Sequence, residues 1–132
     1  DLFYDRLSKV EPISERTPIF RNIHLSNVTG NDIKRIGYIK GIEEMPISEL
    51  SFSNMNIVAG KGFQAETATD IRFNNVSFTV EEGPSLNIRQ CKDIFLNDVR
   101  TKQPIAGQPV VDLEAIENLS IIHCDSTQIV RK

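Results

Sequence analysis

Apolar residues recur along this chain in five similar units. Each unit carries apolar residues at four positions, −3, 0, +2 and +5 from a central residue, with mostly polar residues between them. All 20 of these positions are apolar, whereas 39% of the whole chain is hydrophobic, so the pattern is a repeat and not a result of composition. The central residues are Ile23, Leu50, Ile71, Ile94 and Leu119.

The spacing of the units predicts stacked strands. The centres lie 27, 21, 23 and 25 residues apart. Apolar positions 0 and +2 alternate with position −1, which is always polar, and position +1, which is polar in four of the five units, and this is the period of a half-buried strand. A second short strand begins eight residues before a centre, at Phe63, Leu86 and Val111. No helical i, i+3, i+4 pattern separates the units. Residues 41–46 depart from this spacing, and we expect a longer corner there.

Position +4 distinguishes between two kinds of solenoid. A leucine-rich repeat carries its Asn at +5, but here +5 is apolar and a polar residue stands at +4. Asn, Asp and His are the non-Gly residues found most often in the left-handed region, so this position predicts a tight corner. We therefore expect an all-β fold, a right-handed parallel β-helix of about five coils, with the hand set by the bias of parallel crossovers. The +4 residues are Asn27, Asn54, Asn75, Asp98 and His123.

The length of 132 residues suits one domain. A solenoid needs polar or covered ends, so we expect either that Leu2 and Phe3 fold across the first coil or that this exposed coil end mediates self-association. We assign residues 1–132 to a single β-helix domain, with 1–16 as an N-terminal strand or cap segment, 17–125 as the coils and 126–132 as a C-terminal tail.

Stacking of the coils at about 4.8 Å places equivalent residues above one another. Glu66, Arg89 and Glu114 share position −5, and we predict that they form a ladder of exposed ion pairs. Each pair would contribute at most about 1 kcal/mol because it is exposed to solvent. A structure with Glu66 and Arg89 on opposite faces would refute this register.

Composition and charge argue against several classes of function. The net charge is −3 and the pI is near 5.4, without the basic patch of a nucleic-acid-binding protein. No apolar run approaches the roughly 20 residues of a membrane-spanning helix. Cys91 and Cys124 occupy different apolar positions and are predicted to be core thiols, with a disulfide as the alternative. His24 and His123 lack the spacing of metal ligands, so we expect no metal and no cofactor.

The paired carboxylates have structural explanations. Glu43–Glu44 and Glu81–Glu82 precede Pro or Gly at predicted corners, where charged residues solvate a turn. Asp112 and Glu114 share one face of a strand, and their neighbours in the stack are polar or charged, so a polar sheet surface explains them better than an acid–base pair. Spacing alone therefore reveals no catalytic constellation.

Two stretches of the chain resemble the C-terminal half of glycoside hydrolase family 28, the pectin-degrading polygalacturonases. They are Ser14–Gly30 (SERTPIFRNIHLSNVTG) and Gly41–Ile57 (GIEEMPISELSFSNMNI), and the resemblance extends from about residue 1 to about residue 125. It implies a right-handed parallel β-helix, metal-free hydrolysis of α-1,4-galacturonan with inversion, and an extracellular or periplasmic location.

The resemblance does not include the catalytic motifs of the family. Those are an Asn-Thr-Asp, an Asp-Asp pair, a Gly-His-Gly and an Arg-Ile-Lys, and the chain contains none of them; residues 34–37 read Lys-Arg-Ile-Gly. In the family these motifs precede the matched region, so no catalytic residue is assigned. The segment Asp1–Asp5 (DLFYD) resembles the one that follows the Arg-Ile-Lys, which makes Tyr4 a candidate for sugar contact. Packing of Tyr4 in an N-terminal strand is the alternative.

Two hypotheses of function follow. In the first, the chain is the C-terminal β-helix portion of a glycoside hydrolase that acts on a pectin-like, uronate-containing polysaccharide, and it is inactive alone because the Asp motifs are absent. In the second, it is a noncatalytic β-helix that binds carbohydrate or serves as a scaffold. Neither hypothesis involves nucleic acid or a membrane.

Overall fold

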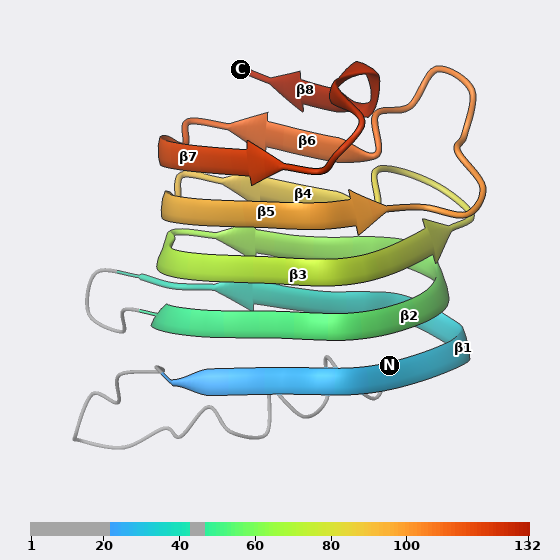
Figure 1. The fold of residues 1–132 in the computed structure, drawn as a ribbon, viewed down its shortest axis with the longest axis horizontal. Coiled ribbons are helices and arrows are strands. Elements are labelled where there is room, and N and C mark those ends of the chain that lie inside the picture. Colours follow the sequence, from blue (N-terminus) through green and yellow to red (C-terminus); the bar gives the residue numbers. More distant parts are fainter. Residues whose placement is uncertain (1–21, 43–46) are drawn as a thin grey trace.

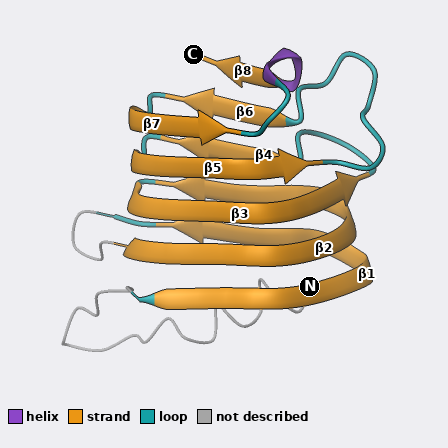
Figure 2. Ribbon diagram, viewed as in Figure 1, coloured by secondary structure: helices purple, strands orange, loops and turns teal. Residues whose placement is uncertain are grey.

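The computed structural model describes residues 22–42 and 47–132, which form a parallel β-solenoid (Figure 1). About 73% of the described residues lie in strands, and the chain makes about four turns. The predicted all-β fold with stacked parallel coils is confirmed, whereas the right-handed winding and the count of five coils stay predictions. Figure 2 shows strands throughout, with a short 3-10 helix near the C-terminal end.

Two ladders of strands form the walls of the solenoid. The front ladder stacks β1, β2, β3, β5 and β7, and the back ladder stacks β1, β2, β4, β6 and β8, because β1 and β2 are long enough to bend from one wall to the other (Figure 1). The elements are β1 Ile23–Lys40, β2 Ile47–Glu66, β3 Ala68–Val80, β4 Leu86–Arg89, β5 Lys92–Arg100, β6 Val111–Glu114, β7 Glu117–Ile122, the helix η1 Ser126–Gln128 and β8 Ile129–Arg131.

The register of both ladders follows the repeat. In the front ladder each central residue pairs with the next, from Ile23 to Leu119. In the back ladder Phe63, Leu86 and Val111 are successive partners, as their common spacing to the centres predicts. The apolar positions therefore stack into continuous inward columns, and burial of these columns is the main stabilising contribution.

Four phenylalanines pack together at the middle of the core. The ring centroid of Phe52 lies 4.9 Å from that of Phe73, stacked one coil above the other, and 5.2 Å from that of Phe63 on the opposite wall. Phe73 also meets Phe63 and Phe78 edge to face, at 5.6 and 6.3 Å. Each of the four rings is at most 1% exposed. Aromatic contacts across the solenoid thus supply core volume in a chain that has no Trp.

Positive backbone φ recurs at three positions of the coil. The predicted corner at +4 is confirmed, since all five residues there have φ between 53 and 58°. A second corner lies at −1, where we expected only the polar side of a strand. Residues there also have positive φ, including Glu49 at 57°, because the stacked backbone must bend at the same place in every coil. The third corner contains Thr67, Gln90 and Ala115, none of which signals a left-handed residue by its type.

The second, third and fourth coils differ in length at one part of the turn. From +5 to the start of the back strand the chain advances 8 residues in the second coil, 10 in the third and 12 in the fourth. From the back strand to the next centre it advances 8 residues in all three. The extra residues belong to the β3–β4 and β5–β6 connections, so we call this part of the turn the variable corner.

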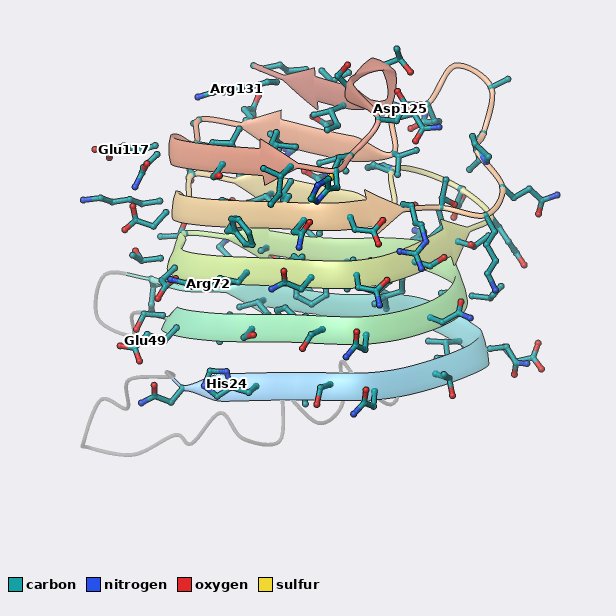
Figure 3. All side chains as sticks on the ribbon, in the orientation of Figure 1. His24, Glu49, Arg72, Glu117, Asp125 and Arg131 are labelled. Carbon is teal, nitrogen blue, oxygen red and sulfur yellow. The ribbon has the colours of Figure 1, made fainter. Side chains whose placement is uncertain are left out.

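The C-terminal segment continues the back ladder. Residues 126–132, which we expected to be a tail, contain η1 and β8, and β8 pairs in parallel with β6. Asp125 caps η1, and its carboxylate accepts hydrogen bonds from both the side chain and the backbone N–H of Thr127. These two hydrogen bonds hold the pKa of the Asp125 carboxyl below its usual value. Arg131 stands in the column of the buried Leu113 but is itself exposed (Figure 3).

Both cysteines are free thiols. Cys91 is buried in the core and donates to the carbonyl oxygen of Arg89, with a sulfur–oxygen distance of 3.2 Å. Cys124 is half-buried and accepts a hydrogen bond from the backbone N–H of Val99 on the coil before it, at 3.4 Å. The interpretation of Cys91 as a core thiol is therefore confirmed, and Cys124 lies at the margin of the core.

Candidate functional site

The outward side of the back ladder carries the candidate binding surface, which we call the polar face. Along each back strand, outward polar residues alternate with buried apolar ones; Gln64, for example, stands between the buried Phe63 and Ala65. Because the strands are in register, the outward residues align into two columns across the coils. One column is Tyr38, Gln64, Asn87 and Asp112, and the other is Lys40, Glu66, Arg89 and Glu114.

Hydrogen bonds connect the two columns of the polar face, and an ion pair joins one column to Lys132. The hydroxyl of Tyr38 donates to Oε2 of Glu66 at 3.4 Å, and Nε of Arg89 donates to Oδ1 of Asn87 at 3.3 Å. Nζ of Lys132 lies 4.0 Å from Oδ1 of Asp112. These contacts orient the side chains of the polar face.

The predicted ladder of Glu66, Arg89 and Glu114 is confirmed in its register. Arg89 pairs with Glu114, with 3.8 Å between Nε and Oε2. Among the described residues, Glu66 makes no ion pair with Arg89 within 4.0 Å and accepts from Tyr38 instead. The Arg89–Glu114 side chains are about half exposed, so their pair contributes at most about 1 kcal/mol.

A groove lies beside the polar face, where the second and third coils pass from the front ladder to the back ladder. It has a volume of about 260 Å³ and shares Gln64 and Asn87 with the polar face. Lys61 and Glu82 form an ion pair in it, with 3.7 Å between Nζ and Oε1. Sequence reasoning missed this groove because its residues come from three coils, and no local motif brings them together.

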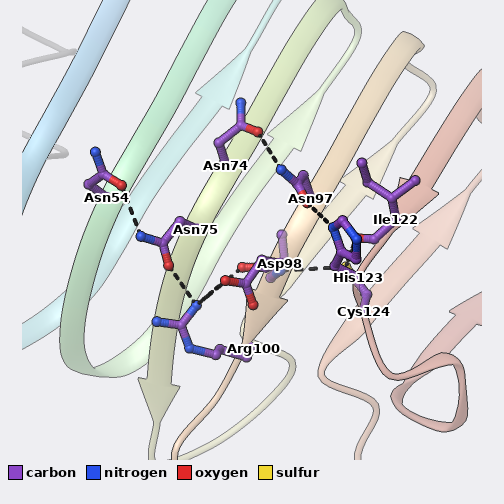
Figure 4. Close-up of polar contacts among 10 residues, drawn as sticks. Asn54, Asn74, Asn75, Asn97, Asp98, Arg100, Ile122, His123 and Cys124 are labelled. Atoms are coloured by element: carbon purple, nitrogen blue, oxygen red, sulfur yellow. Dashed lines mark hydrogen bonds and ion pairs between the residues drawn. The ribbon is translucent and has the colours of Figure 1, made fainter.

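Polar side chains on the front ladder form a second stacked arrangement (Figure 4). Nδ2 of Asn97 donates to Oδ1 of Asn74 at 2.9 Å, and Oδ1 of Asn97 accepts from Nδ1 of His123 at 2.9 Å. Since an amide oxygen can only accept, this contact assigns the proton to Nδ1 of His123. Each of these side chains hydrogen-bonds the next one along the stack, which gives them a structural role. The interpretation of His123 as a corner residue is confirmed by its φ of 53°.

The carboxylates singled out in the sequence have the expected positions where they are described. Glu81 and Glu82 are exposed in the bend between β3 and β4, and Asp112 and Glu114 share the polar face. Tyr4 and Glu43–Glu44 lie outside the described residues. Residues 22–42 and 47–132 contain no group of three His, Cys, Asp or Glu side chains placed to hold a metal ion.

Comparison of the chain with protein-family models, curated proteins and solved structures finds no match. Within the described residues there is no helix with the length and apolar character needed to cross a membrane.

Proposed function

We propose that this chain is the C-terminal β-helix portion of a glycoside hydrolase that acts on a pectin-like polysaccharide outside the cytoplasm. The polar face is the observation that supports the proposal. It presents amide, carboxylate, phenol and cationic groups on a regular sheet surface, and each coil repeats the arrangement about 4.8 Å further along. A polysaccharide has hydroxyl donors and acceptors along its whole length, so it matches a surface of this kind.

The carboxylates of the polar face support binding more than acid–base chemistry. Asp112, Glu114 and Glu66 each contact a cation or a hydroxyl. An inverting glycosidase needs one carboxylic acid and one carboxylate on opposite sides of the scissile bond. Three partnered carboxylates on one surface do not provide that arrangement. The acid and base of the proposed hydrolase would therefore be supplied by residues outside this chain.

The proposal is tested by separating binding from turnover. Polygalacturonate should bind the 132-residue chain in affinity electrophoresis, whereas a reducing-sugar assay on the same mixture should give no signal. Asn87→Ala, in the centre of the polar face, should weaken retention several-fold. Asn56→Ala is the matched control, since Asn56 is an exposed Asn of β2 that does not belong to the polar face. Equal retention of both variants, or clear turnover by the isolated chain, would contradict the proposal.

The partnered carboxylates also favour a second candidate, a noncatalytic β-helix that binds carbohydrate or serves as a scaffold. The two candidates differ in the protein to which the chain belongs. A longer reading frame with the Asn-Thr-Asp, Asp-Asp and Gly-His-Gly motifs upstream of Asp1 would support the hydrolase. Their absence from the full reading frame would support the noncatalytic module.

A further inference from the structure

The groove beside the polar face combines two cations with amide groups. Arg35 and Lys61 are register partners on adjacent coils, and like charges placed opposite each other destabilise a sheet. The chain is acidic as a whole, so this local pair is not a consequence of composition. The residues that define the chemistry of the groove are Arg35, Lys61, Gln64, Glu82, Pro84 and Asn87.

The charge in the groove is only partly compensated. Lys61 pairs with Glu82, but among the described residues Arg35 has no ion-pair partner within 4.0 Å. Two cations and one carboxylate leave the groove with a net charge of +1. The guanidinium of Arg35 is therefore available to an incoming anion, and its planar fork suits bidentate contact with an oxyanion.

The wall of the groove is closely packed. The backbone N–H of Phe63 donates to the carbonyl oxygen of Ser85 at 2.9 Å, which ties the second coil to the third. A Cβ on Gly62 would lie 2.2 Å from that same oxygen and 2.4 Å from the carbonyl oxygen of Pro84. Glycine is required for this close approach. The groove is thus formed by backbone that a ligand need not reorganise.

We propose that this groove is a binding site for an oxyanion, with Arg35 as the principal contact. Lys61 would exchange Glu82 for the anion, and the side-chain amides of Gln64 and Asn87 would hydrogen-bond the rest of the ligand. The oxyanion has two possible sources, a carboxylate of the polysaccharide or free inorganic phosphate. The first source rests on the proposed function, and the second does not.

Isothermal titration calorimetry with trigalacturonate and, separately, with inorganic phosphate tests the site. Arg35→Gln should weaken about tenfold the binding of whichever of these two probes the wild type binds, because it removes a charge-assisted hydrogen bond. Lys34→Gln is the matched control, since it removes the same charge from an exposed residue next to Arg35 and should change affinity less than twofold. Glu82→Gln should tighten binding, because the competing carboxylate is removed.

The outcomes separate this inference from the proposed function. Arg35-dependent binding of phosphate alone supports the site and removes support from a polysaccharide ligand. Trigalacturonate binding that is equal in wild type and Arg35→Gln overturns the site and leaves the proposed function standing. Equal losses in Arg35→Gln and Lys34→Gln, or no binding of either probe, overturn the site. Thermal unfolding of Arg35→Gln checks folding, and relief of the like-charge contact should leave its stability unchanged or raised.

Discussion

Asn75 stands directly above Asn54, and its side-chain Nδ2 donates to Oδ1 of Asn54 at 2.9 Å across the two coils. Both residues have φ of 54°, so each occupies a left-handed corner and a place in a hydrogen-bonded stack. Oδ1 of Asn75 also accepts from Nη1 of Arg100, which pairs with Asp98 on the next coil (Figure 4). Asn thus both tolerates the positive φ of this corner and forms the hydrogen bond to the next coil.

Asn75→Ala should lower the free energy of unfolding by about 1.5–3 kcal/mol. Part of this loss arises because Asn tolerates the left-handed region better than Ala does, and the lost hydrogen bonds supply the rest. Asn75→Gly should cost less than Ala, because glycine tolerates positive φ. Urea unfolding of the two variants measures the difference, with Asn56→Ala as the control. If Gly and Ala cost the same, the backbone requirement at this corner would be refuted.

Gly62→Ala should be more damaging than Gly107→Ala. At Gly62 the added Cβ would collide with the backbone of the next coil, whereas at Gly107 it meets no atom within 4 Å and only the φ of 79° is unfavourable. We expect about 1 kcal/mol for Gly107→Ala and more than about 3 kcal/mol for Gly62→Ala, up to loss of the folded state. Far-UV circular dichroism during thermal unfolding measures both. Similar midpoints would show that the coils can separate at this point.

The Cys91 thiol should make stability fall at alkaline pH. Burial raises the pKa of Cys91 above the ordinary value of 9.0. Near pH 9 the unfolded state releases a proton from this thiol that the folded state retains. The contribution of Cys91 to the free energy of unfolding is therefore complete below pH 9 and is lost as pH rises through the pKa of the folded state. Urea unfolding at pH 7 and pH 10, with reductant, should show a smaller fall for Cys91→Ala than for wild type. An identical fall would assign the effect to other groups.

Arg131→Val should increase self-association of the 132-residue chain. Arg131 places an exposed charge at the end of the column that contains Ile88 and Leu113, and a charge at such a position discourages strand pairing at a sheet edge. Sedimentation velocity should show a larger dimer fraction for Arg131→Val than for Arg72→Val, which removes an exposed arginine from the middle of the front ladder. Association through the N-terminal coil end would appear equally in wild type and both variants.

The repeat made the solenoid and its register predictable, because inward columns require apolar residues at fixed positions of every coil. It also identified the corner at +4, because the positive φ there favours Asn, Asp and His. The corner with Thr67, Gln90 and Ala115 could not be predicted in this way, since neighbouring coils force positive φ on ordinary residue types. The groove was missed for a related reason. The meeting of Arg35, Lys61 and Glu82 depends on the length of each coil, and the repeat pattern does not encode that length at this corner.

The variable corner has a consequence for how such a molecule can diversify. Glu82 and Pro84, two residues of the groove, belong to the β3–β4 connection, which lies at this corner. Insertions and substitutions there change the depth and charge of the groove, while the inward columns keep their spacing and the coils keep their register. Different residues therefore determine the ligand preference of the groove and the stability of the core, so the ligand preference can change while the core residues stay the same.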